Sequence, residues 1–127
     1  MDSKDQFMWL DYQKAGCADF EILKSTLIIH MKEDLDHHSA IFIREQADKL
    51  IEQKNVKNVI FDFSKVSFMD SSGIGVIMGR YKKLLHVGGD ILGVVGVSDR
   101  IDRILKLSGL YKIMRRYQDM QEALIDM

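Results

Sequence analysis

Short apolar runs alternate along the chain with segments in which apolar residues recur every three or four positions. The runs at residues 19–23 and 26–31 flank a short polar break and predict two strands joined by a tight turn. Residues 59–63 and 91–95 form nearly continuous apolar runs, which are typical of strands buried on both faces of a sheet. A last short run at residues 113–114 predicts an edge strand.

The longer periodic segments predict helices. Asp36 can cap the first helix. Its apolar positions recur at helical spacing and are Ala40, Ile43, Ala47, Leu50 and Ile51. The second helix opens near Ser71 and stops at the glycine pair 88–89. Its expected inner face consists of Ile74, Ile77, Met78, Tyr81, Leu84 and Leu85.

Two further helices complete the pattern. Ser98 caps a helix that ends at Gly109, and its inward positions are Ile101, Ile104 and Leu105. Asp119 and Glu122 form a capping-box pattern that opens the last helix. Strands that alternate with helices indicate an α/β fold with a mostly parallel sheet, to which the opening hairpin adds one antiparallel pair. We predict a single domain of this class with about four helices.

Composition narrows the functional classes. The chain has 127 residues, of which 46% are hydrophobic and 29% charged, as in an ordinary globular domain. Its net charge of -1 argues against nucleic acid or an anionic membrane surface as a partner. The longest stretch without a charged residue, 71–79, is too short to span a membrane. A single cysteine, Cys17, and the absence of a secretion signal favour a cytoplasmic location.

The residues do not support catalysis or a metal site. The nucleophile-elbow pattern of serine hydrolases is absent. His86 would lie about 22 Å from Ser71 along a helix, beyond the reach of a general base. Asp34, Asp36 and the adjacent histidines 37–38 lack metal-ligand spacing, so a polar loop with a helix cap is favoured over a metal cluster. There is no phosphate-binding loop motif. We predict no catalytic residue, metal or cofactor.

Residues 68–75 form the most distinctive segment. They follow a buried strand and precede a helix, where α/β folds place their sites. Asp70 or Ser71 can cap this helix, and a phosphate on Ser71 or Ser72 would meet unpaired N–H groups and the positive end of the helix dipole. A capping cluster with no further role is the alternative.

Glycines inside the same helix favour a role in contact. Gly75 and Gly79 each cost a helix about 1 kcal/mol relative to alanine. With Ser71 they are spaced four apart and share one face. Such a stripe suits close approach of another backbone, which could belong to this protein's sheet or to a partner.

Four segments together resemble one known family. They are residues 35–38, 68–77, 79–82 and 107–113. The chain resembles the bacterial anti-sigma factor antagonists of the STAS domain family, and most closely the sporulation type that frees the forespore sigma factor. The resemblance runs from about residue 19 to the end. We therefore expect a STAS domain at residues 19–127, preceded by an N-terminal extension at residues 1–18.

The resemblance implies a function without catalysis. Members of the family bind an anti-sigma factor that is also a serine kinase, which releases the sigma factor. The kinase phosphorylates a serine at the position of Ser71, and a metal-dependent phosphatase removes the phosphate. The candidate partner-binding residues are Asp36, Asp70, Ser72, Gly73, Gly75 and Gly79. Two alternatives are a module that senses a nucleotide or lipid and a scaffold subunit of a stress-signalling assembly.

The chain departs from the family at two places. Glu33 occupies a position where the family usually has glycine, which bears on the conformation of the loop that contains Asp36. The segment 1–18 has no counterpart in the short members and could pack on the domain or contact a partner.

Overall fold

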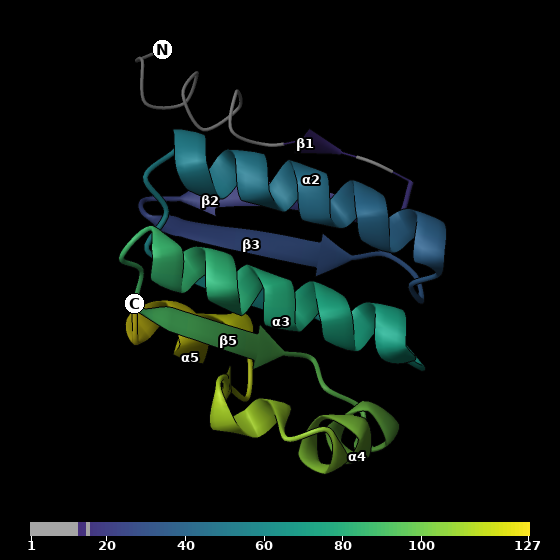
Figure 1. The fold of residues 1–127 in the computed structure, drawn as a ribbon. Coiled ribbons are helices and arrows are strands. Elements are labelled where there is room, and N and C mark those ends of the chain that lie inside the picture. The colour runs from purple at the N-terminus through teal and green to yellow at the C-terminus, as the bar shows by residue number, and fades with distance from the viewer. Residues whose placement is uncertain (1–12, 15) are drawn as a thin grey trace.

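The computed structural model describes residues 13–14 and 16–127 and consists of one six-stranded sheet covered by helices (Figure 1). Most of the predicted extension, residues 1–12 and 15, lies outside the described residues. The strands follow the chain order across the sheet. They are β1 (Gln13–Lys14), β2 (Ala18–Leu23), β3 (Thr26–Met31), β4 (Asn58–Asp62), β5 (Ile91–Val95) and β6 (Arg115–Arg116).

The strand directions agree with the predicted topology. β2 pairs antiparallel with β1 and with β3, whereas β3, β4, β5 and β6 pair parallel. Lys24 adopts a positive φ of 57° at the tight turn between β2 and β3. The α/β class and the opening hairpin predicted from the sequence are confirmed.

Helices cover both faces of the sheet. They are α2 (His37–Gln53), α3 (Ser71–His86), α4 (Asp99–Leu107), a short 3-10 helix η1 (Leu110–Lys112) and α5 (Met120–Ile125). Each predicted cap is confirmed, because the side chains of Asp36, Asp70, Ser98 and Asp119 accept an N–H from the first turn of α2, α3, α4 and α5 respectively.

Two hydrophobic clusters lie on opposite sides of the sheet. The larger one joins the strands to α2 and α3, with Phe20, Ile29 and Phe61 packed against side chains such as Ile43 and Ile77. The smaller one lies under α5. Its buried members are Ile28, Ile60, Val95, Tyr117 and Ala123. α2 and α3 therefore rest on a rigid apolar base, and both begin at the edge where the parallel strands end (Figure 1).

The predicted inner face of α3 is partly wrong. Ile77 and Leu84 are buried as expected, but Met78 and Leu85 are 40% and 54% exposed. The buried face instead includes Val76 and, unexpectedly, Arg80. Burial of Arg80 is possible because its guanidinium Nε lies 2.8 Å from Oδ1 of Asp48 on α2. Hydrophobic periodicity cannot recognise a charged residue at a buried position. The predicted buried face of α3 therefore differs from the observed one, which includes Arg80.

The predicted edge strand is present, but it lies two residues later than the expected 113–114. Met114 is buried in the main cluster, and the strand β6 begins one residue later at Arg115. The 3-10 helix η1 occupies residues 110–112, and Met114 after it packs into the core. The backbone therefore pairs with β5 only from Arg115 onward.

Candidate functional site

The candidate phosphoacceptor lies at the first residue of α3. Asp70 organises this helix start: its Oδ1 accepts the Ser72 N–H at 2.8 Å, and its carbonyl accepts the N–H groups of Gly73 and Ile74 at 3.1 and 3.2 Å. The sequence predicted unpaired donors here for a phosphate. In the structure the N–H groups of residues 72–74 already have partners, so that part of the prediction is wrong.

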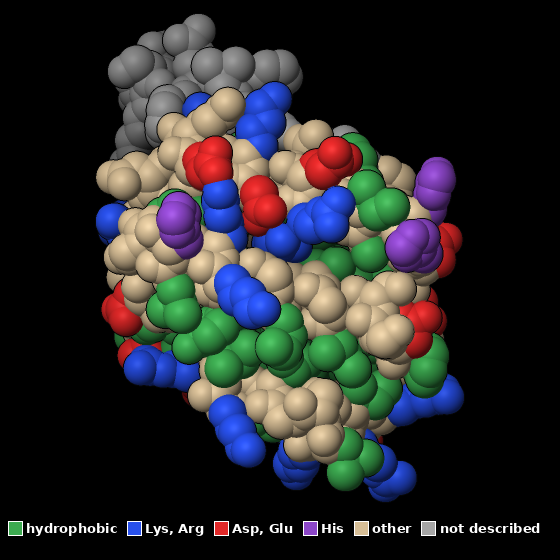
Figure 2. Space-filling model, in the orientation of Figure 1, with side chains coloured by type: hydrophobic (Ala, Val, Ile, Leu, Met, Phe, Trp, Pro, Cys, Tyr) green, Lys and Arg blue, Asp and Glu red, His purple; other side chains and the backbone are tan. Residues whose placement is uncertain are grey.

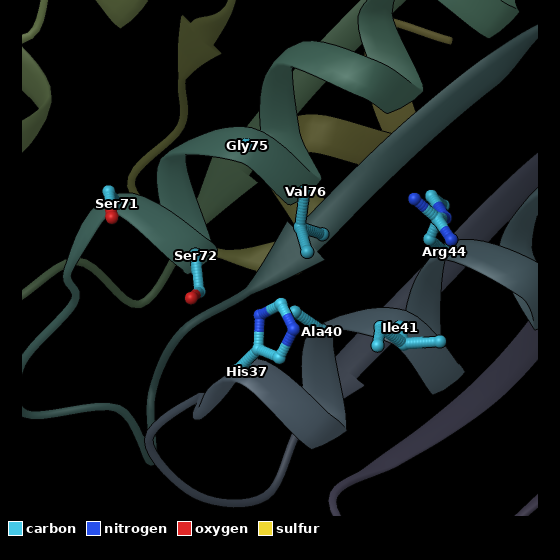
Figure 3. Close-up of a pocket in the computed structure, with 8 residues that line it drawn as sticks. All are labelled: His37, Ala40, Ile41, Arg44, Ser71, Ser72, Gly75 and Val76. Atoms are coloured by element: carbon cyan, nitrogen blue, oxygen red, sulfur yellow. The ribbon is translucent and has the colours of Figure 1, made fainter.

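The two serines occupy different environments. Ser71 is exposed, whereas Ser72 is partly buried. Figure 3 shows the Ser72 hydroxyl directed toward the side of His37, with Ser71 farther out at the end of the helix. A kinase would therefore reach Ser71 more easily than Ser72.

Asp36 lies at the start of the neighbouring helix. Its Oδ1 accepts the N–H of Ser39 at 2.7 Å and the Ser39 hydroxyl at 2.9 Å. These hydrogen bonds, the backbone one first, lower the pKa of Asp36. The exposed carboxylate is ionised and is held at the start of α2 by these two hydrogen bonds.

Asp34 connects the two loops that carry the site. Its Oδ1 accepts the N–H groups of Ser67 and Phe68 at 2.8 and 3.2 Å, and its Oδ2 accepts the Ser67 hydroxyl at 3.0 Å. The backbone hydrogen bond from Ser67 is the main cause of the lowered pKa of Asp34. Sequence reasoning considered Asp34 only as a metal ligand and missed this contact, because its partners lie more than 30 residues away. The described residues contain no group of three side chains suited to a metal ion.

A groove of about 230 Å³ lies between the N-terminal halves of α2 and α3 (Figure 3). From α2 it is lined by His37, Ala40, Ile41 and Arg44. From α3 it is lined by Ser71, Ser72, Gly75 and Val76. The groove therefore brings the two candidate serines together with two basic side chains that the sequence had not assigned to the site. The two walls of the groove come from helices that are far apart in the sequence. No local sequence signal could therefore have predicted that His37 and Arg44 lie beside the serines.

Ion pairs connect the two helices that form this groove. Besides the Arg80–Asp48 contact, Nη2 of Arg80 donates to Oδ2 of Asp48 at 3.2 Å. Lys83 on α3 pairs with Glu52 on α2. Burial lowers the pKa of Arg80, while Asp48 acts in the opposite direction. α2 and α3 are thus joined along their length by two ion pairs.

The three glycines of α3 differ sharply in their surroundings. Gly73 is buried, and a Cβ added there would overlap the side chain of Met69, whose Sδ would be only 2.6 Å away. A Cβ at Gly75 or Gly79 would meet nothing within 4 Å. Gly75 and Gly79 therefore do not pack on the protein's own sheet, which was one of the two alternatives for this glycine stripe. They face solvent.

Apolar and basic side chains surround the open side of α3. Met78 and Leu85 are exposed on the helix, and Phe68 in the preceding loop is 44% exposed. The Arg100 guanidinium carbon lies 4.9 Å from the centroid of the Phe68 ring, within the range of a cation–π contact. Figure 2 shows hydrophobic side chains gathered across the middle of this face, with lysines and arginines around them. Exposed aromatic and arginine side chains are typical of binding surfaces.

Comparison with known proteins agrees with this architecture. A model of the STAS domain matches residues 18–123. A relative from Paenibacillus polymyxa, named anti-sigma F factor antagonist, is 36% identical over 104 residues, covering 82% of this chain and 88% of the relative. Two solved structures are also similar: the anti-sigma factor antagonist SpoIIAA in its unphosphorylated form and the Bacillus cell fate determinant SpoIIAA in the phosphorylated form.

The two SpoIIAA structures match this fold equally well. They are 28% and 31% identical to the chain, cover 86% of it, and each gives a TM-score of 0.69; the match spans 94% and 97% of their own lengths. The chain belongs to the STAS domain family, which confirms the resemblance seen in the sequence. No helix in the part of the chain described by the structure is both long and apolar enough to cross a membrane.

Proposed function

We propose that this protein is an anti-sigma factor antagonist that binds an anti-sigma factor with serine kinase activity, frees a sigma factor, and is switched off by phosphorylation of Ser71. The observation that carries the proposal is the exposed Ser71 at the start of a helix whose adjoining glycine face is open to solvent. The names of its relatives and the existence of both phosphorylated and unphosphorylated SpoIIAA support the same function.

The proposed docking surface combines the open side of α3 with the adjacent loops. Gly75 and Gly79 allow the partner backbone to approach, Ser72 lines the groove together with the acceptor, and Asp36 caps the neighbouring helix α2. Asp70 acts by fixing the start of α3, and the buried Gly73 acts by letting the helix pack over Met69. Phe68, in the loop before α3, and Arg100, which stacks on its ring, would extend this surface.

Phosphorylation would act locally at this surface. A phosphate adds about -1.5 to -2 charges next to Asp70. In water the repulsion is screened, but in a complex the charges are desolvated and like-charge contact costs several kcal/mol. We expect the fold to be unchanged, which is supported by the equal similarity of this chain to the two forms of SpoIIAA.

The remaining parts of the proposal concern partners and organisation. The protein supplies the acceptor hydroxyl and performs no catalysis itself, and a metal-dependent phosphatase restores the active form. Such a circuit, with an ATP-dependent kinase and a sigma factor, would operate in the cytoplasm. The STAS domain would comprise residues 19–127, with residues 1–18 as an added segment.

Phosphotransfer provides the direct test. The full chain is incubated with ATP and the kinase encoded beside it, and the modified residue is located by mass spectrometry. We expect one phosphate on Ser71, its loss in Ser71→Ala, and its retention in the matched control Ser72→Ala. Asp36→Ala should weaken kinase binding in calorimetric titration. Binding of a nucleotide or lipid without any phosphotransfer would instead favour the small-ligand alternative and contradict the proposal.

A further inference from the structure

A phosphate on Ser71 needs hydrogen-bond donors, and the start of α3 offers few. The N–H groups of Ser72, Gly73 and Ile74 already donate to Asp70. A phosphate could use them only by displacing the cap that holds the helix start. Strong donors must therefore come from another element, and the closest one is α2 across the groove.

The α2 wall of the groove carries two basic side chains and no acidic one. His37 lies in the first turn opposite the serines, and Arg44 lies two turns farther along (Figure 3). Ser71 and Arg44 line the same groove, and Gly75 between them contributes no side chain to it. Arginine is well suited to phosphate because its guanidinium presents several donors in a planar fork.

The acidic groups near the groove are engaged elsewhere. Asp36 caps α2 through Ser39, and Asp70 caps α3 through Ser72. Asp48 forms the ion pair with the buried Arg80. These contacts leave His37 and Arg44 facing the groove, and neither forms an ion pair with a carboxylate in the part of the chain described here.

We propose that the groove between α2 and α3 is an intramolecular phosphate site, in which His37 and Arg44 hold the phosphate of phosphorylated Ser71. This inference rests on the proposed phosphorylation of Ser71. Ser71 lines the groove, and of the three staggered rotamers open to its exposed side chain, one turned toward α2 would direct a phosphate into the groove. Phosphorylation would then place the new negative charge in the groove beside Arg44 and His37.

The site can be tested without any kinase. Phosphoserine is incorporated at position 71 of the full chain during translation, and the phosphate is titrated by phosphorus NMR. The second pKa of an unconstrained phosphoserine is about 6. Nearby cations favour the dianion, so we expect a pKa lower by about half a unit or more. His37→Gln and Arg44→Gln should each return the value toward 6, and the double variant should return it fully.

Two substitutions serve as matched controls. His38→Gln removes the neighbouring histidine, and Lys49→Gln removes an exposed cation of α2; neither side chain lines the groove. Both should leave the phosphoserine pKa at its lowered value. The phosphate site would be overturned if the phosphoserine pKa were the same in the unsubstituted chain and in the double variant. It would also be overturned if the control substitutions raised this pKa as much as His37→Gln or Arg44→Gln. Failure of the kinase to modify Ser71 would instead contradict the proposed function, so the two failures are distinguishable.

Discussion

The two faces of the sheet are built differently. On the α2–α3 face the strands present a continuous apolar surface, and the polar residues of the candidate site lie on the far side of the covering helices. On the α5 face a smaller apolar cluster adjoins a network of ionisable side chains. The first face carries the proposed binding surface, and the second contains groups whose charge changes with pH.

The ionisable network is centred on His30 of β3. Its Nδ1 lies 2.9 Å from Oδ2 of Asp62, and its Nε2 lies 3.0 Å from Oε1 of Glu21. The hydrogen bond with Asp62 is the largest cause that raises the pKa of His30 to about 9. Burial opposes ionisation of Asp62, but hydrogen bonds from His30 and Ser64 lower its pKa to about 2. His30 is therefore a structural cation at neutral pH.

This difference separates the proposed binding surface from the groups that we expect to make stability depend on pH. The groove and the glycine stripe are on one side of the sheet, and the His30 network is on the other. Substitutions on the outer side of α3 should change partner affinity without changing stability much. Substitutions in the His30 network should do the opposite.

The largest expected effect is at Gly73, on the inner side of α3. Gly73→Val places atoms where the buried Met69 side chain already lies. Overpacking of this kind should lower the free energy of unfolding by about 1–3 kcal/mol. Urea denaturation followed by circular dichroism measures the change. A stability equal to that of the unsubstituted chain would show that this side of α3 is not tightly packed.

The next effect concerns affinity. Gly75→Leu adds a large side chain to the open side of α3, where a Cβ meets nothing within 4 Å. Binding to the kinase should fall by about tenfold or more, equivalent to about 1.4 kcal/mol. Calorimetric titration measures the affinity, and thermal denaturation should show that the fold is kept. Unchanged affinity would place the partner elsewhere, whereas a large loss of stability would mean that α3 packs through this face.

The third effect is a pH dependence. The folded-state pKa of His30 is raised from 6.5 to about 9, so its contribution to stability is fully present below pH 6.5 and is lost as the pH rises through 9. We expect about 1–2 kcal/mol, after allowing for screening of a side chain that is 30% exposed. Urea denaturation between pH 6 and 10 measures the free energy of unfolding. In His30→Gln this free energy should no longer fall as the pH rises through 9, and the affinity for the kinase should stay unchanged.

The control for this experiment is His86→Gln, which changes an exposed histidine at the end of α3. This variant should retain the pH dependence of the unsubstituted chain. Equal pH profiles for His30→Gln and the unsubstituted chain would show that the His30 network does not contribute to stability.

The smallest effect is a gain in stability. Gly75→Ala adds one methyl group in open space and removes a helix-interior glycine. The free energy of unfolding should rise by about 0.5–1 kcal/mol, as expected from helix propensity. Urea denaturation measures it, and the same substitution at Gly79 should behave alike. A loss of stability at either position would contradict the solvent-facing placement of the glycine stripe.

Local signals explain why much of the fold could be predicted. The four helix caps depend on side chains within three residues of the N–H groups that they accept, and the strand order follows from the alternation of apolar runs with helical segments. The prediction failed where distant contacts decide the outcome. Arg80 is buried because Asp48 lies on the next helix, and β6 begins late because Met114 enters the core.

The candidate site divides in the same way. The sequence by itself determined that Ser71 opens a helix after a buried strand, that Asp36 and Asp70 are caps, and that Gly75 and Gly79 share one face. Only the tertiary structure decided that this face is open, that Gly73 is closed by Met69, and that Asp34 joins the two loops. It also decided that His37 and Arg44 stand across a groove from the serines. Spacing along a chain fixes which residues share a face of a helix, but the packing of neighbouring helices fixes what that face meets.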